Sequence, residues 1–149
     1  MLRLGETQRP AYPHASDPAS MKKIGTCPEF TKEDTEVAIA AAAAALPSWR
    51  AATGRQRARI LRKWYDLMME NVDDLATLIT WENGKPIADA KGEVAYAAGF
   101  YEWFAEEAPR TYGDTIPATV PGNRVITIRE PVGVCGLITP LVCMAFRGF

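Results

Sequence analysis

Hydrophobic and polar residues recur with a helical period over most of residues 31–110. The preceding residues 1–30 contain several prolines and show no period, so we predict that they are irregular. Thr31 is followed three residues later by Asp34, which is close to a capping box, and an alanine-rich run follows. This pattern predicts a first helix that ends at Pro47.

Three further helices are predicted before residue 110. The second begins after Gly54, because its apolar residues share one face while its basic residues take other faces. The third ends at Gly84, which suits a left-handed C-cap. The fourth runs from Pro86 to about Glu107, and Pro109 ends it. The apolar face of the second helix comprises Ile60, Leu61, Trp64, Leu67 and Met68.

The pattern changes to strands after residue 111. The stretches Thr115 to Val120 and Arg124 to Arg129 are rich in Val, Ile and Thr and flank the turn Pro121-Gly122-Asn123. These stretches predict a β-hairpin. Alternation in its second arm makes one face apolar and the other mixed, so we expect the hairpin to pack on another surface, such as another subunit.

Residues 131–140 form a nearly continuous apolar run between two prolines, which is typical of a strand buried on both faces of a parallel sheet. Only residues 141–149 follow, so no βαβ unit can form after it. Four side chains that lose such neighbours forfeit about 1.5–3 kcal/mol each, and we expect a marginally folded chain that tends to associate. These side chains are Val132, Val134, Leu137 and Ile138.

Composition narrows the class of protein. The chain has 149 residues, 48% of them hydrophobic, and a net charge of -1, which fits one ordinary domain and disfavours nucleic-acid binding. No run reaches the roughly 20 apolar residues of a membrane span, so we expect no membrane association. Three widely spaced cysteines argue against a disulfide framework and suit a reducing compartment. We expect a cytoplasmic protein and leave a mitochondrial location open.

Few residues are candidates for chemistry, and no metal site is expected because the chain has a single histidine. His14 is far in sequence from any cysteine that it could activate. We expect Cys135 to pack as a small hydrophobic residue. Glu102 and Glu106 are four residues apart, a spacing that is typical of a solvated helix face.

The glycines and tryptophans also favour structural roles. Gly133 and Gly136 lie inside the apolar run and do not match a phosphate-binding loop, so we expect them to permit close backbone packing. The tryptophans all fall in predicted helices, where packing in a core or an interface explains them better than nucleic-acid stacking does. They are Trp49, Trp64, Trp81 and Trp103.

Three stretches resemble the aldehyde dehydrogenase superfamily, and most closely its succinate-semialdehyde dehydrogenase members. They are Asn-Gly-Lys-Pro-Ile-Ala-Asp-Ala-Lys-Gly-Glu-Val at 83–94, Glu-Trp-Phe-Ala-Glu-Glu-Ala at 102–108 and Tyr-Gly-Asp at 112–114. The run from Glu130 to Pro140 resembles the family's entry into its cofactor domain. The resemblance extends from about Asp17 to Pro140.

The resemblance implies an α/β fold with a Rossmann-type cofactor domain. This chain would supply its helical part at 31–110, an oligomerisation hairpin at 111–130 and the first sheet strand at 131–140. The implied activity is the NAD(P)+-dependent oxidation of succinate semialdehyde to succinate in γ-aminobutyrate catabolism, by a homo-oligomer. NAD and NADP stay open as cofactors. By the same similarity, the backbone at Ile138, Thr139 and Pro140 would line the nicotinamide side of the cofactor pocket.

Residues 141–149 depart from the family, which continues Trp-Asn-Phe-Pro and uses that Asn to hold an oxyanion. The family's glutamate base and cysteine nucleophile lie further on, and the surroundings of Cys143 do not match that cysteine's motif. We therefore expect no catalytic residue in this chain, and predict an inactive N-terminal fragment. The alternative is a non-catalytic module that docks on full-length aldehyde dehydrogenase subunits through its hairpin.

Overall fold

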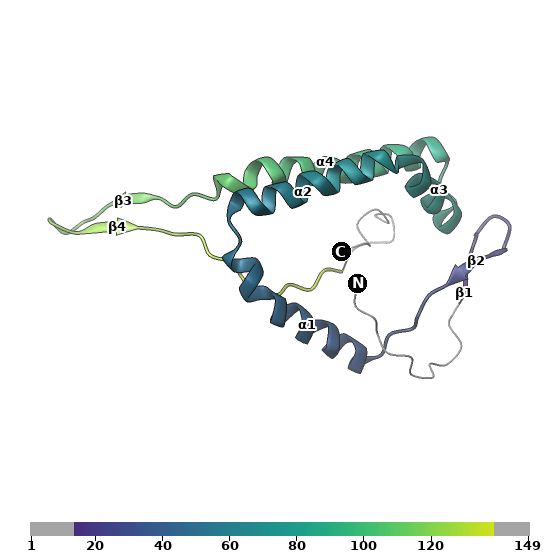
Figure 1. Cartoon of the computed structure of the whole chain (residues 1–149), viewed down its shortest axis with the longest axis horizontal. Helices are drawn as coiled ribbons and strands as arrows, with labels where there is room; N and C mark the ends of the chain where they lie inside the picture. Colours follow the sequence, from purple (N-terminus) through teal and green to yellow (C-terminus); the bar gives the residue numbers. More distant parts are fainter. Residues whose placement is uncertain (1–13, 139–149) are drawn as a thin grey trace.

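A computed structural model describes residues 14–138, which are mostly helical (Figure 1). The fold consists of two small antiparallel hairpins and four helices, and a 3-10 turn follows the last helix. Two helices, α2 (Gly54–Glu70) and α4 (Ile87–Glu107), lie side by side, and α3 (Val72–Asn83) packs at one end of this pair (Figure 1).

The segment before the first helix is not wholly irregular, so that prediction is wrong for the described part. Strand β1 (His14–Ser16) pairs antiparallel with β2 (Lys23–Thr26). The turn between them is held by Asp17, whose side chain accepts a hydrogen bond from the Ser20 hydroxyl at 2.5 Å. Strands this short are hard to detect, because three or four residues hardly establish a period of two.

Helix α1 (Lys32–Ala51) begins with the predicted capping box at Thr31 but continues past Pro47. The prediction that Pro47 ends it is wrong. Proline removes one backbone donor, yet the helix runs unbroken through Pro47 to Ala51, and the Ser48 hydroxyl donates to the Ala45 carbonyl at 2.9 Å. None of the side chains of α1 is buried by the rest of the described chain.

The core lies between α2, α3 and α4 and is built largely of small side chains. Alanines on α4 allow its backbone to approach the neighbouring helices closely, and Val94 is fully buried at its centre. Trp64 of α2 stacks on Tyr101 of α4 with ring centroids 4.8 Å apart. The buried cluster comprises Met68, Ala76, Ile79, Ala90, Val94, Ala97 and Ala98.

Capping interactions within one turn mark the helix ends, and the sequence predicted some of them. Gly84 caps α3 in the left-handed conformation with φ of 70°, as predicted. A second capping box, between Thr53 and Gln56, begins α2 and went unnoticed in the sequence. Helix α4 ends at Glu107, as predicted, and the 3-10 turn η1 (Ala108–Arg110), which contains Pro109, follows it.

The predicted hairpin is confirmed, although its strands β3 (Thr115–Pro117) and β4 (Arg124–Ile126) are shorter than expected. At its base, the Thr127 backbone N–H donates to the Asp114 carbonyl and the Asp114 N–H donates to the Thr127 hydroxyl, both at 2.8 Å. The hairpin projects away from the helices, and its strands are exposed (Figure 1). No described residue covers its apolar face.

The strand predicted at 131–140 does not form over residues 131–138, which carry no regular secondary structure. A strand needs a neighbour for its backbone hydrogen bonds, and no other described segment pairs with this one. Its side chains are correspondingly open to solvent, and Val132 is 93% exposed. The two remaining residues of the prediction, Thr139 and Pro140, and the tail at 141–149 lie outside the described residues.

Candidate functional site

The residues predicted to line a cofactor pocket are not gathered into a site by the described chain. The Ile138 side chain is fully exposed, and Thr139 and Pro140 lie outside the described residues. Dinucleotide sites place a pyrophosphate on a glycine-rich turn between a strand and a helix N-terminus. Within residues 14–138, the one strand that precedes a helix directly is β2, and no glycine lies between Thr26 and Lys32. The described residues alone do not fit a dinucleotide.

Two cysteines lie within the described chain. Cys27 and Cys135 are both exposed. Our prediction that Cys135 packs as a small hydrophobic residue is therefore wrong, because the strand that would have buried it is not formed. Cys143 lies outside the described residues. Among residues 14–138, no cluster of three or more metal-binding side chains exists, and no helix is long and apolar enough to cross a bilayer.

The two glycines of the apolar run do not make the close backbone contacts that we predicted. A β-carbon placed on Gly133 or Gly136 would meet no other atom within 4 Å. Gly133 is instead distinguished by its φ of 114°, a conformation that side chains disfavour. Close packing at both positions requires neighbours that the described residues do not supply.

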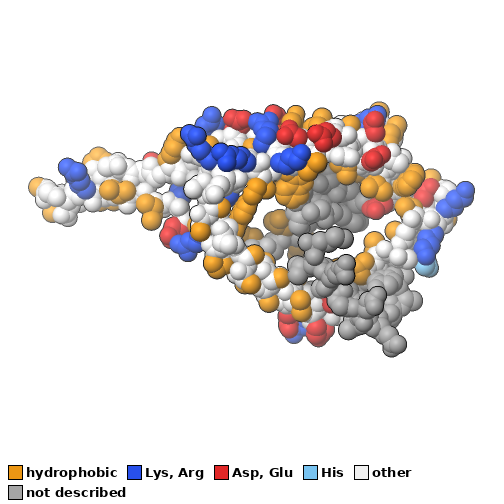
Figure 2. All heavy atoms as spheres, viewed as in Figure 1, with side chains coloured by type: hydrophobic (Ala, Val, Ile, Leu, Met, Phe, Trp, Pro, Cys, Tyr) orange, Lys and Arg blue, Asp and Glu red, His pale blue; other side chains and the backbone are white. Residues whose placement is uncertain are grey.

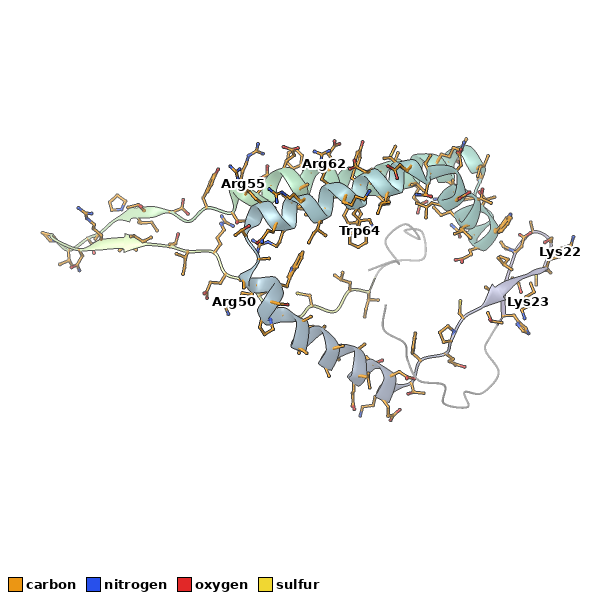
Figure 3. The ribbon with its side chains drawn as sticks, viewed as in Figure 1. Lys22, Lys23, Arg50, Arg55, Arg62 and Trp64 are labelled. Atoms are coloured by element: carbon orange, nitrogen blue, oxygen red, sulfur yellow. The ribbon has the colours of Figure 1, made fainter. Side chains whose placement is uncertain are left out.

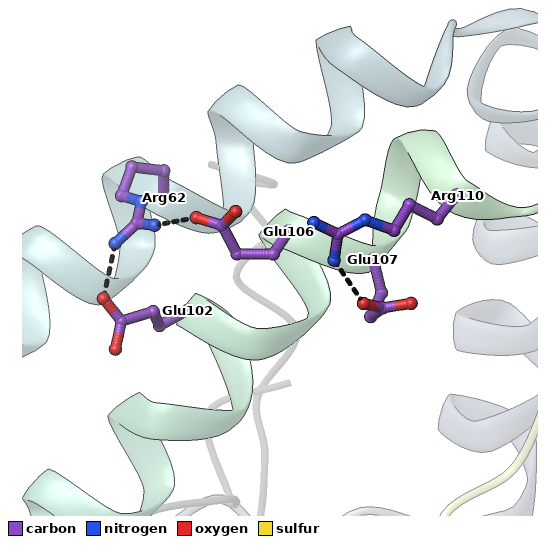
Figure 4. Close-up of polar contacts among 5 residues, drawn as sticks. All are labelled: Arg62, Glu102, Glu106, Glu107 and Arg110. Carbon is purple, nitrogen blue, oxygen red and sulfur yellow. Dashed lines mark hydrogen bonds and ion pairs between the residues drawn. The ribbon is translucent and has the colours of Figure 1, made fainter.

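An ion-pair cluster joins α2 to α4 (Figure 4). The Arg62 guanidinium lies 2.7 Å from Glu102 Oε1 and 2.6 Å from Glu106 Oε1, and these hydrogen bonds raise the pKa of Arg62. A similar contact, at 2.7 Å, joins Arg110 to Glu107. We predicted a solvated helix face for Glu102 and Glu106. Both side chains are about half exposed, but they also bind Arg62. The missed signal is an i, i+4 acid pair opposite an arginine-rich helix.

A second polar contact is more deeply buried. Lys85 pairs with Glu93 of α4, whose side chain is only 10% exposed. The other carboxylate oxygen, Glu93 Oε1, and the hydroxyl of Thr80 are buried without a hydrogen-bond partner in the described chain. Unsatisfied buried acceptors are unfavourable by roughly 1–3 kcal/mol each.

The tryptophans divide into one core residue and three exposed ones. Trp64 packs against the buried cluster, as predicted for a core residue. The other side chains lie between 46% and 63% exposed, so the described chain gives them neither a core nor an interface. The exposed set is Trp49, Trp81 and Trp103.

An apolar groove of about 420 Å³ runs along α2. It is lined by the apolar residues Ile60, Trp64 and Leu67 and by the basic residues Arg59 and Lys63. Figure 3 shows Trp64 on the side of α2 that faces α1, whereas the labelled arginines Arg55 and Arg62 lie on the opposite side of the helix. The residues that line this groove include no carboxylate.

Comparison with known proteins decides the family. The sequence pattern of the aldehyde dehydrogenase family matches residues 7–141. This chain belongs to the aldehyde dehydrogenase family. Glutarate-semialdehyde dehydrogenase of Pseudomonas putida is 56% identical over 125 residues, which are 84% of this chain and 26% of that protein. NADP+-dependent succinate-semialdehyde dehydrogenase of Escherichia coli is 54% identical over 125 residues, with the same coverage.

Solved structures give the same family. Succinate-semialdehyde dehydrogenase from Burkholderia pseudomallei superposes with a TM-score of 0.81 at 50% identity, over 84% of this chain and 26% of that one. Betaine aldehyde dehydrogenase of Staphylococcus aureus, in complex with NAD+, superposes with a TM-score of 0.77 at 28% identity, over 81% of this chain and 25% of that one. The family and fold class predicted from the sequence are confirmed. This aldehyde dehydrogenase chain spans about a quarter of the length of these relatives.

Proposed function

We propose that this chain is the N-terminal, mostly helical part of an NAD(P)+-dependent semialdehyde dehydrogenase that oxidises succinate semialdehyde to succinate. In this proposal the chain does not turn over substrate by itself. The single observation that carries it is the coverage of the relatives: 84% of this chain matches at over half identity, yet the match takes in only 26% of each relative.

The substrate class rests on what the relatives share. Those named above act on glutarate and succinate semialdehyde, and a Halomonas elongata relative that is 50% identical is an aspartate-semialdehyde dehydrogenase. All three substrates carry a carboxylate at the end of the molecule remote from the aldehyde. A short aldehyde with a distal carboxylate is therefore the substrate class, and succinate semialdehyde is our choice within it.

The described residues support a non-catalytic part of that enzyme. Within 14–138, the two cysteines are exposed, and no dinucleotide cradle is built. We infer that the backbone at Ile138, Thr139 and Pro140 reaches the cofactor only when the rest of an enzyme subunit is present. NAD(P)+ then supplies the hydride acceptor. We place the reaction in the cytoplasm, with the mitochondrion kept open because the mouse relative is mitochondrial.

The test is to assay the purified 149-residue chain with succinate semialdehyde and either NAD+ or NADP+, and to measure cofactor binding by calorimetry. The E. coli relative serves as the positive control in the same buffer. We expect neither turnover nor saturable cofactor binding by the chain alone. Formation of reduced cofactor at a rate proportional to chain concentration would overturn the proposal.

The exposed hairpin favours a second candidate function, that of a non-catalytic module that docks on full-length aldehyde dehydrogenase subunits. Both strands of the hairpin are exposed, and Ile126 and Ile128 are 68% and 75% accessible. In this case a tagged chain should capture the full-length E. coli relative, and Ile126→Asp should abolish the capture. A chain that captures nothing through its hairpin would exclude this candidate.

A further inference from the structure

Charged side chains are sorted by sign along one face of α2. Arg59 and Lys63 lie in the N-terminal half of the row, and Asp66 and Glu70 lie in its C-terminal half. Their spacing of four, three and four residues places all four on one face of the helix. All four side chains are exposed, and in Figure 2 basic side chains gather over the end of α2 that is nearer the projecting hairpin.

The four side chains of this row have no charged partner within the described chain. The neighbouring Arg62 directs its guanidinium to α4, whereas no side-chain hydrogen bond or ion pair joins any of the four to another residue of 14–138. Four positions along the helix, Arg59 meets Lys63 and Asp66 meets Glu70, and such like-charge pairs are unfavourable in a single helix. A partner that brings the opposite charge to each half would relieve both pairs.

A second copy of α2, laid antiparallel on this face, brings the opposite charge to each position. The midpoint of the row lies halfway between Lys63 and Asp66, and it is also halfway between Arg59 and Glu70. A two-fold axis through this midpoint therefore places Lys63 beside Asp66 of the second copy, and Arg59 beside Glu70 of the second copy. Each contact occurs twice, because such an interface is self-complementary.

Apolar residues on one flank of the charged row add contact area to the same arrangement. Ile60 and Leu67 are seven residues apart and therefore share this flank, where they are 50% and 43% exposed. The two-fold axis brings the same flank of both copies together, so Ile60 of one copy lies near Leu67 of the other. Burial of these side chains supplies attraction, and the charged row selects the antiparallel direction.

We propose that this chain forms a two-fold symmetric dimer through the charged face of α2, with the two helices antiparallel. The partner is a second copy because a ligand of one sign would be repelled by one half of the row. A parallel copy would place like charges together. The dimer is independent of the proposed function, since it concerns association and not turnover, and it leaves the hairpin free.

Sedimentation equilibrium of the purified chain, over about a hundredfold range of concentration, tests the dimer. We expect a monomer–dimer equilibrium that weakens as salt is added, because the paired charges are near solvent. Arg59→Glu and Glu70→Arg should each raise the dissociation constant at least about tenfold, since each places two like-charge pairs in the dimer. Arg124→Glu, in the exposed strand β4, is the matched control and should change the dissociation constant less than about twofold.

Mixing the two charge-reversal variants tests the register directly. A dimer of one Arg59→Glu chain with one Glu70→Arg chain pairs opposite charges at both contacts, so the mixture should dimerise although neither variant does so alone. The double variant R59E/E70R should dimerise by itself for the same reason. Because this recovery requires folded chains, it also separates lost association from lost folding.

Four outcomes would overturn the dimer. They are a chain that stays monomeric throughout, association that strengthens as salt is added, a loss with Arg124→Glu as large as that with Arg59→Glu, and charge-reversal variants that do not recover on mixing.

Discussion

Trp64 of α2 stacks on Tyr101 of α4, with their ring centroids 4.8 Å apart. The stack lies beside the buried cluster, where the small side chains of α4 bring the two helices close together. Aromatic pairs of this kind add about 0.5–1.5 kcal/mol beyond the burial of their area. The Trp64–Tyr101 stack, the Arg62 ion pairs and the buried cluster all join α2 to α4.

Partial burial raises the pKa of Tyr101 to about 12. An unfolded tyrosine ionises near pH 10, so the unfolded chain loses this proton first. The free energy of unfolding should therefore be independent of this group below about pH 10, and should fall between about pH 10 and pH 12.

Urea unfolding followed by circular dichroism across this range measures the effect. Tyr101→Phe should weaken the alkaline loss of stability, whereas Tyr96→Phe, at a side chain that is 66% exposed, should not. A tyrosinate absorbance titration should lose its highest-pKa component in the Tyr101 variant only. Loss of a component near the ordinary value of about 10 would show that Tyr101 is not shielded.

Removing the Arg62 ion pairs should loosen α2 from α4. Both contacts are partly exposed and screened by solvent, so we expect Arg62→Met to cause a small decrease in the urea concentration at which half of the chain is unfolded. Glu102→Gln should have a smaller effect, and the double variant should be less than additive. Arg55→Met is the control, because Arg55 makes no ion pair with a described residue. Equal effects at Arg55 and Arg62 would contradict a role for the cluster.

The helices were largely predictable because their signals are local. A capping residue, the helical spacing of apolar residues and Gly84 each act within one or two turns, and the structure places helix ends near them. Pro47 misled the prediction, since one missing donor does not stop a helix whose next turn can still bond. The Arg62 cluster was missed because it joins residues about 40 positions apart.

The capping box that begins α2 gives a simple test of local stability. Thr53→Ala removes the side-chain oxygen that accepts the Gln56 N–H, and we expect stability to fall by about 1 kcal/mol. Thr53→Ser keeps this oxygen and should retain most of the stability. Thermal unfolding monitored by circular dichroism compares the two. If serine is as damaging as alanine, the hydroxyl is not the stabilising group.

Two glycine-to-alanine substitutions should act in opposite directions. A β-carbon on Gly113 would lie 1.8 Å from the Thr127 carbonyl oxygen, so Gly113→Ala should open the base of the hairpin. A β-carbon on Gly92 meets nothing within 4 Å, so Gly92→Ala should stabilise α4 by about 0.5–1 kcal/mol. Amide hydrogen exchange should show loss of protection at Thr127 in the first variant. Protection that is unchanged there would contradict the close approach.

The site could not be predicted to the same depth as the helices. The apolar run at 131–140 indicated a buried strand, but burial depends on neighbours that are distant in sequence or on another chain. The predictions that Cys135 is packed and that Gly133 makes close backbone contacts were wrong because both assumed a formed sheet. The family could be predicted nevertheless, because the resemblance rests on sequence motifs and does not require knowledge of the tertiary contacts.

The most direct measurement is a dehydrogenase assay of the purified 149-residue chain with succinate semialdehyde and NAD+ or NADP+, beside the full-length E. coli relative in the same buffer. Our account predicts reduced cofactor from the relative and none from the chain alone. Turnover by the chain alone would contradict the claim that it is a part of a semialdehyde dehydrogenase that does not act by itself.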